Sequence, residues 1–509
     1  MILKFDFIYI SDNDFFEYLL RYYTKGYDYN LIKSKNKYTL ILKAEEKNML
    51  EFCEKLKHIG NSVFLRQFDI SEFNKEFEKD NETNLLNFNK KDFLTYLNAN
   101  SYLQDNKLLH NEWNEFVNMQ ISFDNIDFIQ IDQNNFDILL NKSINNLQNS
   151  KDIFIKDNHS IYKISIFDIK NQASFLMPTN IKAINSIFVC NNENLKLLAS
   201  IEKPLIKLKF NAIFKHKHEI KDNYHKIRLA YNLFLFALTN KMYERSFIFL
   251  SFNKIKYFED EFEIFEYENK LIQISGFDYI NTKAKKMIFD KNDKNIARIS
   301  YILSNCDENT LLLELSKDYD DILLIDKEKN LLNLDIAKNS IELYDILQED
   351  DISKRLFDNF NKQFKLPNKN FDLKNSFFSL FCIIGNILGL DDNLKKAGEK
   401  LLVLSDESRL PRGVKIDFKF KQNNKEFDYI KTIKSTMSFM LAGVESANIA
   451  YGAVESLAFF LRDLYDELLE KQIVNNALIT GSLFEHKSLL KNTLKLLKNS
   501  KISNVPLRI

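Results

Sequence analysis

Histidine and cysteine are the residue types that most often hold metal ions, and one place in this chain brings histidines close together. His216 and His218 form a His-x-His pair, and His225 follows after a lysine-rich stretch from Lys215 to Lys221. The four cysteines lie far apart, at positions 53, 190, 306 and 382, and no CxxC pair occurs. Because no cysteine or carboxylate set completes the ligands, the sequence predicts a solvated basic loop here rather than a metal site.

Other motifs that bind phosphates or activate nucleophiles are absent from the sequence. It contains no GxxxxGK[ST], GxGxxG, HExxH or GxSxG pattern. Seven of the ten glycines lie between Gly385 and Gly481. Glycine permits tight turns and close backbone approach, so we expect the more constrained architecture in this C-terminal part.

Length and composition indicate how many domains the chain has and which classes of protein it does not resemble. The 509 residues suggest about three domains. With 71 basic and 71 acidic residues the formal charge is zero, which argues against nucleic acid as a partner. The first residues lack the pattern of a signal peptide, and the apolar runs at 231–238 and 377–390 are too short or too interrupted to span a membrane. Together with scattered thiols, this predicts a cytoplasmic protein without membrane insertion.

The N-terminal 72 residues alternate between strand and helix patterns. The predicted elements are a strand at Leu3–Ile10, a helix at Asp14–Tyr23, strands at Tyr29–Ser34 and Tyr38–Ala44, a helix at Glu46–His58 and a strand at Ser62–Ile70. The order βαββαβ is the ferredoxin-like arrangement. Residues 73–112 are rich in Asn, Lys, Glu and Asp, which predicts a linker with some helix.

The remainder of the chain also mixes strands and helices. For residues 113–290 we expect strands at Lys203–Phe210 and Phe247–Phe252 and a short helix at Asn194–Ser200. Beyond residue 290 the predicted elements are a strand at Asp321–Ile325, helices at Ser376–Leu390 and Ile430–Glu470, a strand at Asn476–Thr480 and a helix at Glu485–Leu497.

Several segments, in the same order along the chain, resemble the HypF-type carbamoyltransferases that mature [NiFe] hydrogenases. Asn476–Leu490 (NALITGSLFEHKSLL) is similar to the family's VALSGGVFQNRLL, and Ala397–Glu399 (AGE) lies where the family has EGQ. In the middle, Leu197–Leu208 (LLASIEKPLIKL) resembles LLxSxxRPIVLL, and Leu250–Asn253 (LSFN) lies where the family has TSGN. Phe15–Arg21 lies where its first domain has FRPF.

The resemblance implies a multidomain α/β fold. Residues 1–72 would be an acylphosphatase-like domain, 73–112 a linker replacing the family's zinc-finger module, 113–290 a YrdC-like domain, and 291–509 a truncated ASKHA-type, carbamoyltransferase-like domain. The family uses carbamoyl phosphate and ATP to form a carbamoyl-adenylate. It passes the carbamoyl group to a partner protein's C-terminal cysteine, as a precursor of the hydrogenase cyanide ligands.

This chain departs from the family in the first two implied domains. Phe16 occupies the position expected for the phosphate-binding arginine, and Ser11–Asp14 replaces the glycine-rich phosphate loop, although Asn30 remains. The YrdC-like basic elements are missing. Ser251 and Asn253 are kept as a remnant of a nucleotide pocket, but Phe252 replaces the glycine between them, and we expect it to crowd a backbone that should approach a ligand.

The implied C-terminal site departs as well. The family's histidine cluster is missing, since only His486 follows His225, so no metal is expected. Gly481 is kept as a further nucleotide-binding remnant, but Ser482 replaces the second glycine of the turn. The sequence ends at Ile509, before the family's Asn-Asp-Gly-Gly motif, so this domain is expected to be truncated.

Three hypotheses remain open. The first is a pseudoenzyme without cofactor or catalytic residues, an accessory protein that binds hydrogenase subunits or other maturation proteins. The second is an active carbamoyl- or adenylyl-transferase that uses ATP and carbamoyl phosphate at a rewired site with Ser251, Asn253 and Gly481. The third is a relative in fold alone, with an unrelated role.

Overall fold

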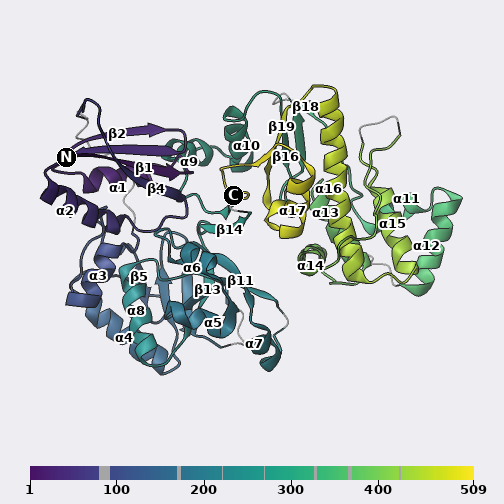
Figure 1. The fold of residues 1–509 in the computed structure, drawn as a ribbon. Coiled ribbons are helices and arrows are strands. Elements are labelled where there is room, and N and C mark those ends of the chain that lie inside the picture. The colour runs from purple at the N-terminus through teal and green to yellow at the C-terminus, as the bar shows by residue number, and fades with distance from the viewer. Residues whose placement is uncertain are drawn as a thin grey trace. The chain divides into compact units, whose positions relative to one another are not determined.

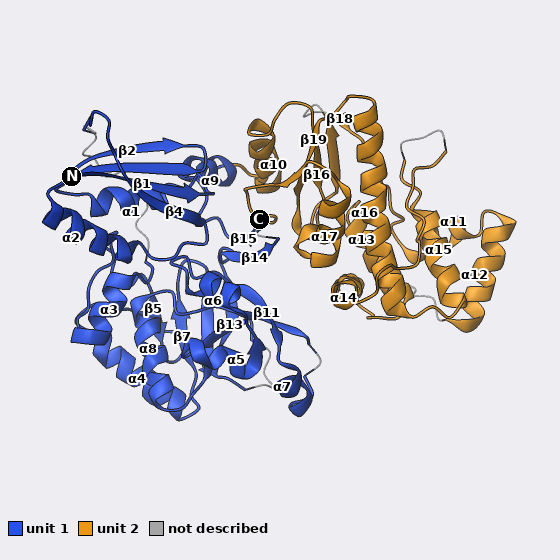
Figure 2. Ribbon diagram, in the orientation of Figure 1, with its two compact units in different colours: residues 1–290, 509 blue, residues 291–508 orange. Residues whose placement is uncertain are grey.

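The computed structural model describes residues 1–79, 92–168, 173–220, 222–268, 270–325, 329–364, 370–422 and 426–509. The chain forms two compact units, residues 1–290 and residues 291–508 (Figures 1 and 2). Both combine helices with a mixed or antiparallel sheet, so the expected multidomain α/β class is observed. Among the described residues, no helix combines the length and the apolar character needed to cross a membrane.

The first unit begins with the βαββαβ order expected from the sequence. Its elements are β1 (Ile2–Tyr9), α1 (Phe15–Tyr23), β2 (Asp28–Ser34), β3 (Lys37–Lys43), α2 (Glu46–Leu56) and β4 (Leu65–Glu72). The strands pair antiparallel in the order β2-β3-β1-β4 (Figure 1). Phe5, Phe7 and Tyr9 alternate along β1 and are buried, which matches the two-residue period of a half-buried strand.

Part of the segment predicted to be a linker is folded into this unit. Helix α3 spans Tyr96–Asp105 and begins with a capping box between Thr95 and Asn98. Trp113, the first residue after the predicted linker, is buried and stacks on Tyr18, with 4.2 Å between the ring centroids. Residues 80–91 of the predicted linker lie outside the described residues.

A larger sheet follows in the same unit. In the described residues it has nine strands, in the order β10-β11-β12-β9-β13-β8-β7-β5-β6. The elements are β5 (Gln120–Ser122), β6 (Ile129–Gln130), α4 (Phe136–Gln148), β7 (Ile153–Lys156), β8 (Ser160–Ile166), β9 (Phe175–Pro178), α5 (Ile184–Ile187), β10 (Phe188–Val189), α6 (Asn192–Ala199), β11 (Ile206–Phe210), α7 (Ala212–Lys217), β12 (Tyr224–Ile227), α8 (Leu233–Glu244) and β13 (Phe249–Tyr257). A hairpin of β14 (Glu263–Tyr267) and β15 (Lys270–Ser275) and helix α9 (Thr282–Phe289) complete the unit.

In the second unit, helices surround a smaller sheet. The described strands lie in the order β18-β17-β16-β19-β20, and β19 pairs parallel with both β16 and β20. The elements are α10 (Lys294–Ser304), β16 (Thr310–Glu314), β17 (Ile322–Ile325), β18 (Lys329–Asn330), α11 (Ser340–Leu347), α12 (Asp351–Gln363), α13 (Phe377–Ile387), α14 (Leu394–Glu407), α15 (Tyr429–Leu441), α16 (Ser446–Glu470), β19 (Asn476–Thr480), α17 (Lys487–Leu496) and β20 (Ser500–Ile502).

Buried apolar strands and one buried arginine organise this sheet. Leu311, Leu312 and Leu313 of β16 are fully buried, as expected for a strand covered on both faces. The guanidinium of Arg298 is also buried. It donates from Nη1 to Oγ1 of Thr480 at 2.9 Å and from Nη2 to Glu314 at 2.5 Å, and so holds α10 against the sheet.

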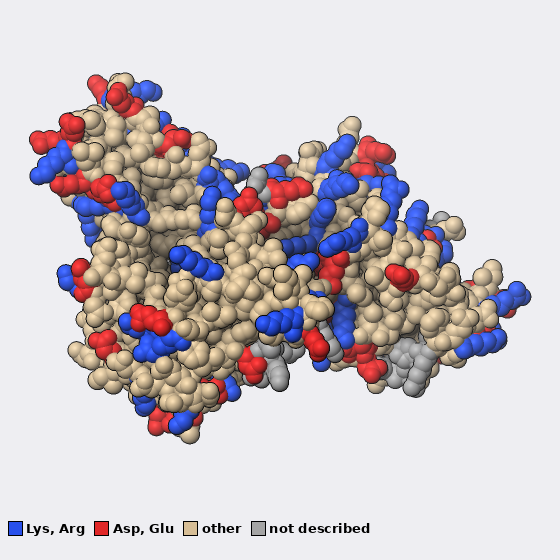
Figure 3. Space-filling model, turned by 60° about the horizontal axis from the view of Figure 1, so that its bottom comes forward, with Lys and Arg blue, Asp and Glu red and all other residues tan. Residues whose placement is uncertain are grey.

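The surface carries both signs of charge. On the face drawn in Figure 3, Lys and Arg side chains are interspersed with Asp and Glu rather than gathered into one basic patch. This mixture agrees with the zero formal charge of the sequence.

Candidate functional site

The loop Ser11–Asp14 is closed by one of its own side chains. Asn13 is 2% exposed, and its Oδ1 accepts hydrogen bonds from the hydroxyl of Tyr9 and from the backbone N–H of Phe15, both at 3.1 Å. Its Nδ2 donates to Oγ of Ser11 at 2.9 Å and to the carbonyl of Tyr279 at 3.2 Å. The Asn13 amide thus uses loop groups that an incoming phosphate would need.

Phe16 is a core residue at the position where the resemblance implies a phosphate-binding arginine. It is fully buried, stacks on Tyr9 with 4.6 Å between ring centroids, and lies edge-on to Tyr38. Asn30 lies on β2, where its Nδ2 donates to the backbone carbonyl of Glu78 at 2.9 Å. Neither side chain supplies the bidentate cation that phosphoryl oxygens require.

The segment Ser251–Asn253, in which the resemblance implies the remnant of a nucleotide pocket, lies on β13 in the large sheet. Ser251 is fully buried, and its Oγ has no hydrogen-bond partner within the described part of the chain. The Phe252 ring packs in the core, stacked on Phe175 with 4.6 Å between centroids and an interplanar angle of 20°. Because neighbouring side chains of a strand point to opposite faces, the Phe252 ring lies on the face opposite to the side chains of Ser251 and Asn253.

The three histidines do not form the predicted basic loop. His216 lies on the short helix α7, His218 is the residue after it, and His225 lies on strand β12. Asn211 caps this helix by accepting hydrogen bonds from two backbone N–H groups, which explains why a lysine-rich stretch is ordered. Of the residues described, no group of three or more His, Cys, Asp or Glu side chains is placed to hold a metal ion. Lys221 lies outside them.

Gly481 makes a tight turn directly after β19 in the second unit. Its φ is +103°, and a Cβ at this position would lie 2.1 Å from the carbonyl oxygen of Leu315. The Oγ of the next residue, Ser482, accepts a hydrogen bond from the backbone N–H of Lys317 at 2.8 Å. The turn therefore brings the start of α17 against the residues that follow β16.

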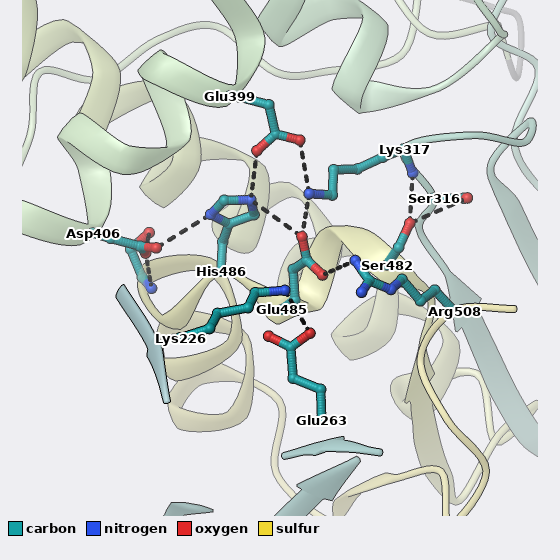
Figure 4. Close-up of polar contacts among 11 residues, drawn as sticks. Lys226, Glu263, Ser316, Lys317, Glu399, Asp406, Ser482, Glu485, His486 and Arg508 are labelled. Carbon is teal, nitrogen blue, oxygen red and sulfur yellow. Dashed lines mark hydrogen bonds and ion pairs between the residues drawn. The ribbon is translucent and has the colours of Figure 1, made fainter. Parts of the chain in front are cut away.

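A buried charged cluster lies beside this turn (Figure 4). The Nζ of Lys317 lies 2.8 Å from Oε1 of Glu399 on α14 and also contacts the carboxylate of Glu485. Nη1 of Arg508 lies 3.5 Å from the second carboxylate oxygen of Glu485. Burial opposes the charge on Lys317, but Glu485 and Glu399 hold the pKa of its ammonium above the ordinary value.

His486 joins the same cluster from its other side. Its Nδ1 lies 3.2 Å from Oδ2 of Asp406, and its Nε2 lies 3.5 Å from Oε2 of Glu399. Burial disfavours the imidazolium, yet the two carboxylates raise the pKa of His486 above its usual value. Asp406 is fixed in turn, since its Oδ1 accepts from the N–H and the hydroxyl of Ser488, both at 2.7 Å.

The cluster is electrically balanced. With His486 protonated, three cationic groups face three carboxylates, which are Lys317, His486 and Arg508 against Glu399, Asp406 and Glu485. Burial raises the pKa of Glu399, but His486 and Lys317 outweigh burial and lower it to about 2. The Glu399 side chain is 44% exposed and forms the accessible edge of the cluster. A phosphate or metal ion could bind here only by displacing existing ion pairs.

Sequence reasoning located this region only in part. Gly481, Ser482 and the segment Ala397–Glu399 were singled out by resemblance, and His486 as a remaining histidine. Lys317, Asp406 and Arg508 were missed, because each is an isolated charged residue far along the chain from its partners. Gly481 lies beside this cluster in the second unit, whereas Ser251 and Asn253 belong to the first unit.

Comparisons with known proteins show which proteins this chain resembles in sequence and in fold. No family model matches the sequence. Protein HydE of Wolinella succinogenes is 24% identical over 376 residues, covering 67% of this chain and 68% of that protein. The structure of full-length HypF in its phosphate- and nucleotide-bound form matches with a TM-score of 0.58 and 11% identity, and HypF of T. kodakarensis with 0.61 and 12%. Each match covers 100% of this chain and 96% of the solved one, which confirms the HypF resemblance as a likeness of fold.

Proposed function

We propose that this chain is an accessory protein for the maturation or assembly of [NiFe] hydrogenase, with a HypF-like scaffold and no carbamoyltransferase activity. The fold match along the whole chain and the sequence match with Protein HydE support this role. Its partners would be hydrogenase subunits or other maturation proteins, in the cytoplasm. The family's chemistry would be lost while its binding surfaces are kept.

The balanced cluster beside Gly481 is the observation that carries the proposal. At the place where the resemblance implies a nucleotide-binding turn, the largely buried Lys317 and the partly exposed Arg508 already pair with Glu485. A nucleotide phosphate would have to compete with this carboxylate for both cations. Displacing it would leave a buried, unpaired carboxylate, at a cost on the order of several kcal/mol. The cluster therefore favours a structural function over nucleotide binding.

The implied phosphate site in the first segment favours the same conclusion. Asn13 uses donors and acceptors of the loop that would hold a phosphoryl group, and Phe16 is part of the core. We further propose that residues 1–72 are acylphosphatase-like, 113–290 YrdC-like, and 291–509 a truncated ASKHA-type domain. The βαββαβ order of the first segment supports its assignment.

The first experiment is hydrogen-dependent dye reduction in a strain that lacks the gene, with processing of the hydrogenase large subunit followed in the same cells. We expect both to fall and to return with a complementing copy. Native affinity purification from the complemented strain should recover a hydrogenase component. Unchanged activity in the deletion strain would contradict the proposed role in hydrogenase maturation and leave only a likeness to HypF in fold.

An active transferase is the second candidate, and one observation favours it. The buried hydroxyl of Ser251 lacks a partner among the residues described, as it would if a ligand normally satisfied it. Calorimetry with ATP, with and without carbamoyl phosphate, decides between the candidates. Complementation by a copy carrying Ser251→Ala and Asn253→Ala extends the test, with Ser165→Ala on the neighbouring strand as the matched control. Binding of ATP, or lost complementation by the double variant alone, would favour the transferase.

A further inference from the structure

The first unit contains a cavity of about 570 Å³, which reaches from the loop Ser11–Asp14 to residues that the resemblance does not assign to any site. Its walls come from the loop after β1, from the segment around Phe93 and Trp113, from residues 157–159 and 228–231, and from the region of α9. Its volume lies within the usual range for small-molecule sites, about 300–1,000 Å³. The polar groups on its wall indicate which ligand it would accept.

Arg228 is a buried cation in the wall without a carboxylate partner. Its residue surface is only 5% exposed, its Nε donates to the carbonyl of Lys203 at 2.9 Å, and the guanidinium lies 4.0 Å from the ring centroid of Tyr231. Across the described ranges, no ion pair involves Arg228, and its Nη1 has no hydrogen-bond partner. Glu261 and Asp157 stabilise its charge without making an ion pair with it. The unpartnered, buried Nη1 still favours an anionic hydrogen-bond acceptor beside it, because an unmade hydrogen bond of a buried charged group is costly.

Two carboxyl groups, those of Asp92 and Asp157, lie in the same wall. Oδ2 of Asp92 accepts a hydrogen bond from the N–H of Asn118 at 2.8 Å, while its Oδ1 is buried and has no partner in the described structure. Oδ2 of Asp157 accepts from the hydroxyl of Tyr231 at 2.6 Å, the same ring on which Arg228 lies. The described residues form no ion pair with either carboxylate.

The rest of the wall near Asp92 is aromatic. Phe93 and Trp113 are both 4% exposed and pack edge to face, with 4.7 Å between centroids. Phe15 stacks on Trp113 at 5.1 Å. A ligand for this cavity thus meets an unpartnered guanidinium donor, an unpartnered carboxyl oxygen and an apolar surface. This combination favours a ligand that carries an acceptor, a donor and an apolar group over a simple anion or cation.

We propose that this cavity binds a free zwitterionic α-amino acid with an apolar or aromatic side chain. The carboxylate of the ligand pairs with the guanidinium of Arg228 as a charge-assisted hydrogen bond. Its ammonium group faces Asp92 and Asp157, and its side chain packs on Phe93 and Trp113. This site is independent of the maturation role proposed above, because it needs no hydrogenase component.

The test uses the full chain and three matched probes. They are L-phenylalanine, 3-phenylpropionate, which lacks the ammonium group, and phenethylamine, which lacks the carboxylate. Calorimetry and thermal unfolding should detect binding of L-phenylalanine, with each of the other two at least tenfold weaker. If 3-phenylpropionate or phenethylamine bound as tightly as L-phenylalanine, the proposal that the ligand needs both charged groups would be overturned. Absence of binding by L-phenylalanine, L-leucine and L-tryptophan at millimolar concentration would overturn the site.

Variants locate the binding. Arg228→Met and Asp92→Asn should each weaken L-phenylalanine at least tenfold, and Arg228→Lys, which keeps the charge, should weaken it less than Arg228→Met. Arg245→Met, which changes a surface arginine at the end of α8, is the control and should leave the affinity unchanged. Circular dichroism of each variant separates lost binding from lost folding. Wild-type affinity in a folded Arg228→Met variant would contradict the proposed contact.

Discussion

In the second unit, Nζ of Lys317 lies 2.8 Å from Oε1 of Glu399, and this contact joins the residues after β16 to helix α14. The same ammonium group contacts Glu485, so one lysine links two elements that are far apart in sequence. Lys317 is largely buried, and both Glu399 and Glu485 form an ion pair with it. We therefore expect the stability of this unit to respond strongly to the loss of Lys317.

We expect Lys317→Met to lower the free energy of unfolding of the second unit by about 3 kcal/mol, because the buried Glu485 then keeps only its longer contacts with Arg508 and His486. Urea unfolding followed by circular dichroism measures the loss. Lys471→Met is the matched control, since Lys471 pairs with Glu467 on the surface, where such pairs contribute about 0–1 kcal/mol. Equal effects of the two substitutions would contradict the structural weight given to Lys317.

His486 should make stability depend on pH. The carboxylates of Asp406 and Glu399 raise its folded pKa above the unfolded value near 6.5, so its contribution is complete below that value. The contribution is lost as pH rises through the folded pKa. Thermal unfolding of the wild type should therefore shift to lower temperature over this range.

The variant His486→Gln isolates that effect. It should unfold at a lower temperature than the wild type at pH 6 and show a flatter pH dependence above it. His216→Gln changes an exposed histidine on α7 and should keep the wild-type slope. A wild-type slope in His486→Gln would show that another group titrates in this range.

Local sequence patterns predicted the elements better than the site. Alternation of Phe5, Phe7 and Tyr9 marked β1, and an uninterrupted apolar periodicity marked α16. The predicted helical region Ile430–Glu470 divides into α15 and α16 at Gly443, whose φ is +75°. A glycine in a periodic stretch is tolerated in many helices, so periodicity alone does not locate this break.

The charged cluster and the cavity could not be predicted in the same way. Lys317, Asp406 and Arg508 meet only in the folded chain, and charged residues make up 28% of the sequence, so none is distinctive by type. Arg228 is similar, because its unpartnered, buried Nη1 is visible only in the folded chain. Resemblance located Gly481 because a tight turn leaves a local signature in sequence.

Phe16→Arg tests whether one substitution can give residues 1–72 the phosphatase activity that the HypF resemblance implies for them. Phe16 is fully buried against Tyr9, so an arginine there buries an unpaired charge and should cost about 3 kcal/mol or more. We expect a destabilised protein without hydrolysis of an acyl phosphate. Ile32→Arg, at a residue of β2 that is 50% exposed, should leave stability nearly unchanged. Acyl phosphate hydrolysis by a folded Phe16→Arg variant would contradict the view that Asn13 blocks the loop.

Ser251→Ala tests whether the Ser251 hydroxyl contributes to nucleotide binding. The Oγ of Ser251 is buried without a partner among the described residues, so its removal should keep or raise the free energy of unfolding, by up to about 1 kcal/mol. Ser160→Ala on the paired strand β8 is the matched control, because the buried Ser160 hydroxyl donates to the carbonyl of Lys256 and its loss should cost about 1 kcal/mol. Urea unfolding in the absence of ligand measures both changes. If ATP raises the stability of the wild type but not of Ser251→Ala, the hydroxyl serves a nucleotide. Stabilisation by Ser251→Ala with no response to ATP in either protein is the result expected of a scaffold that has lost its chemistry.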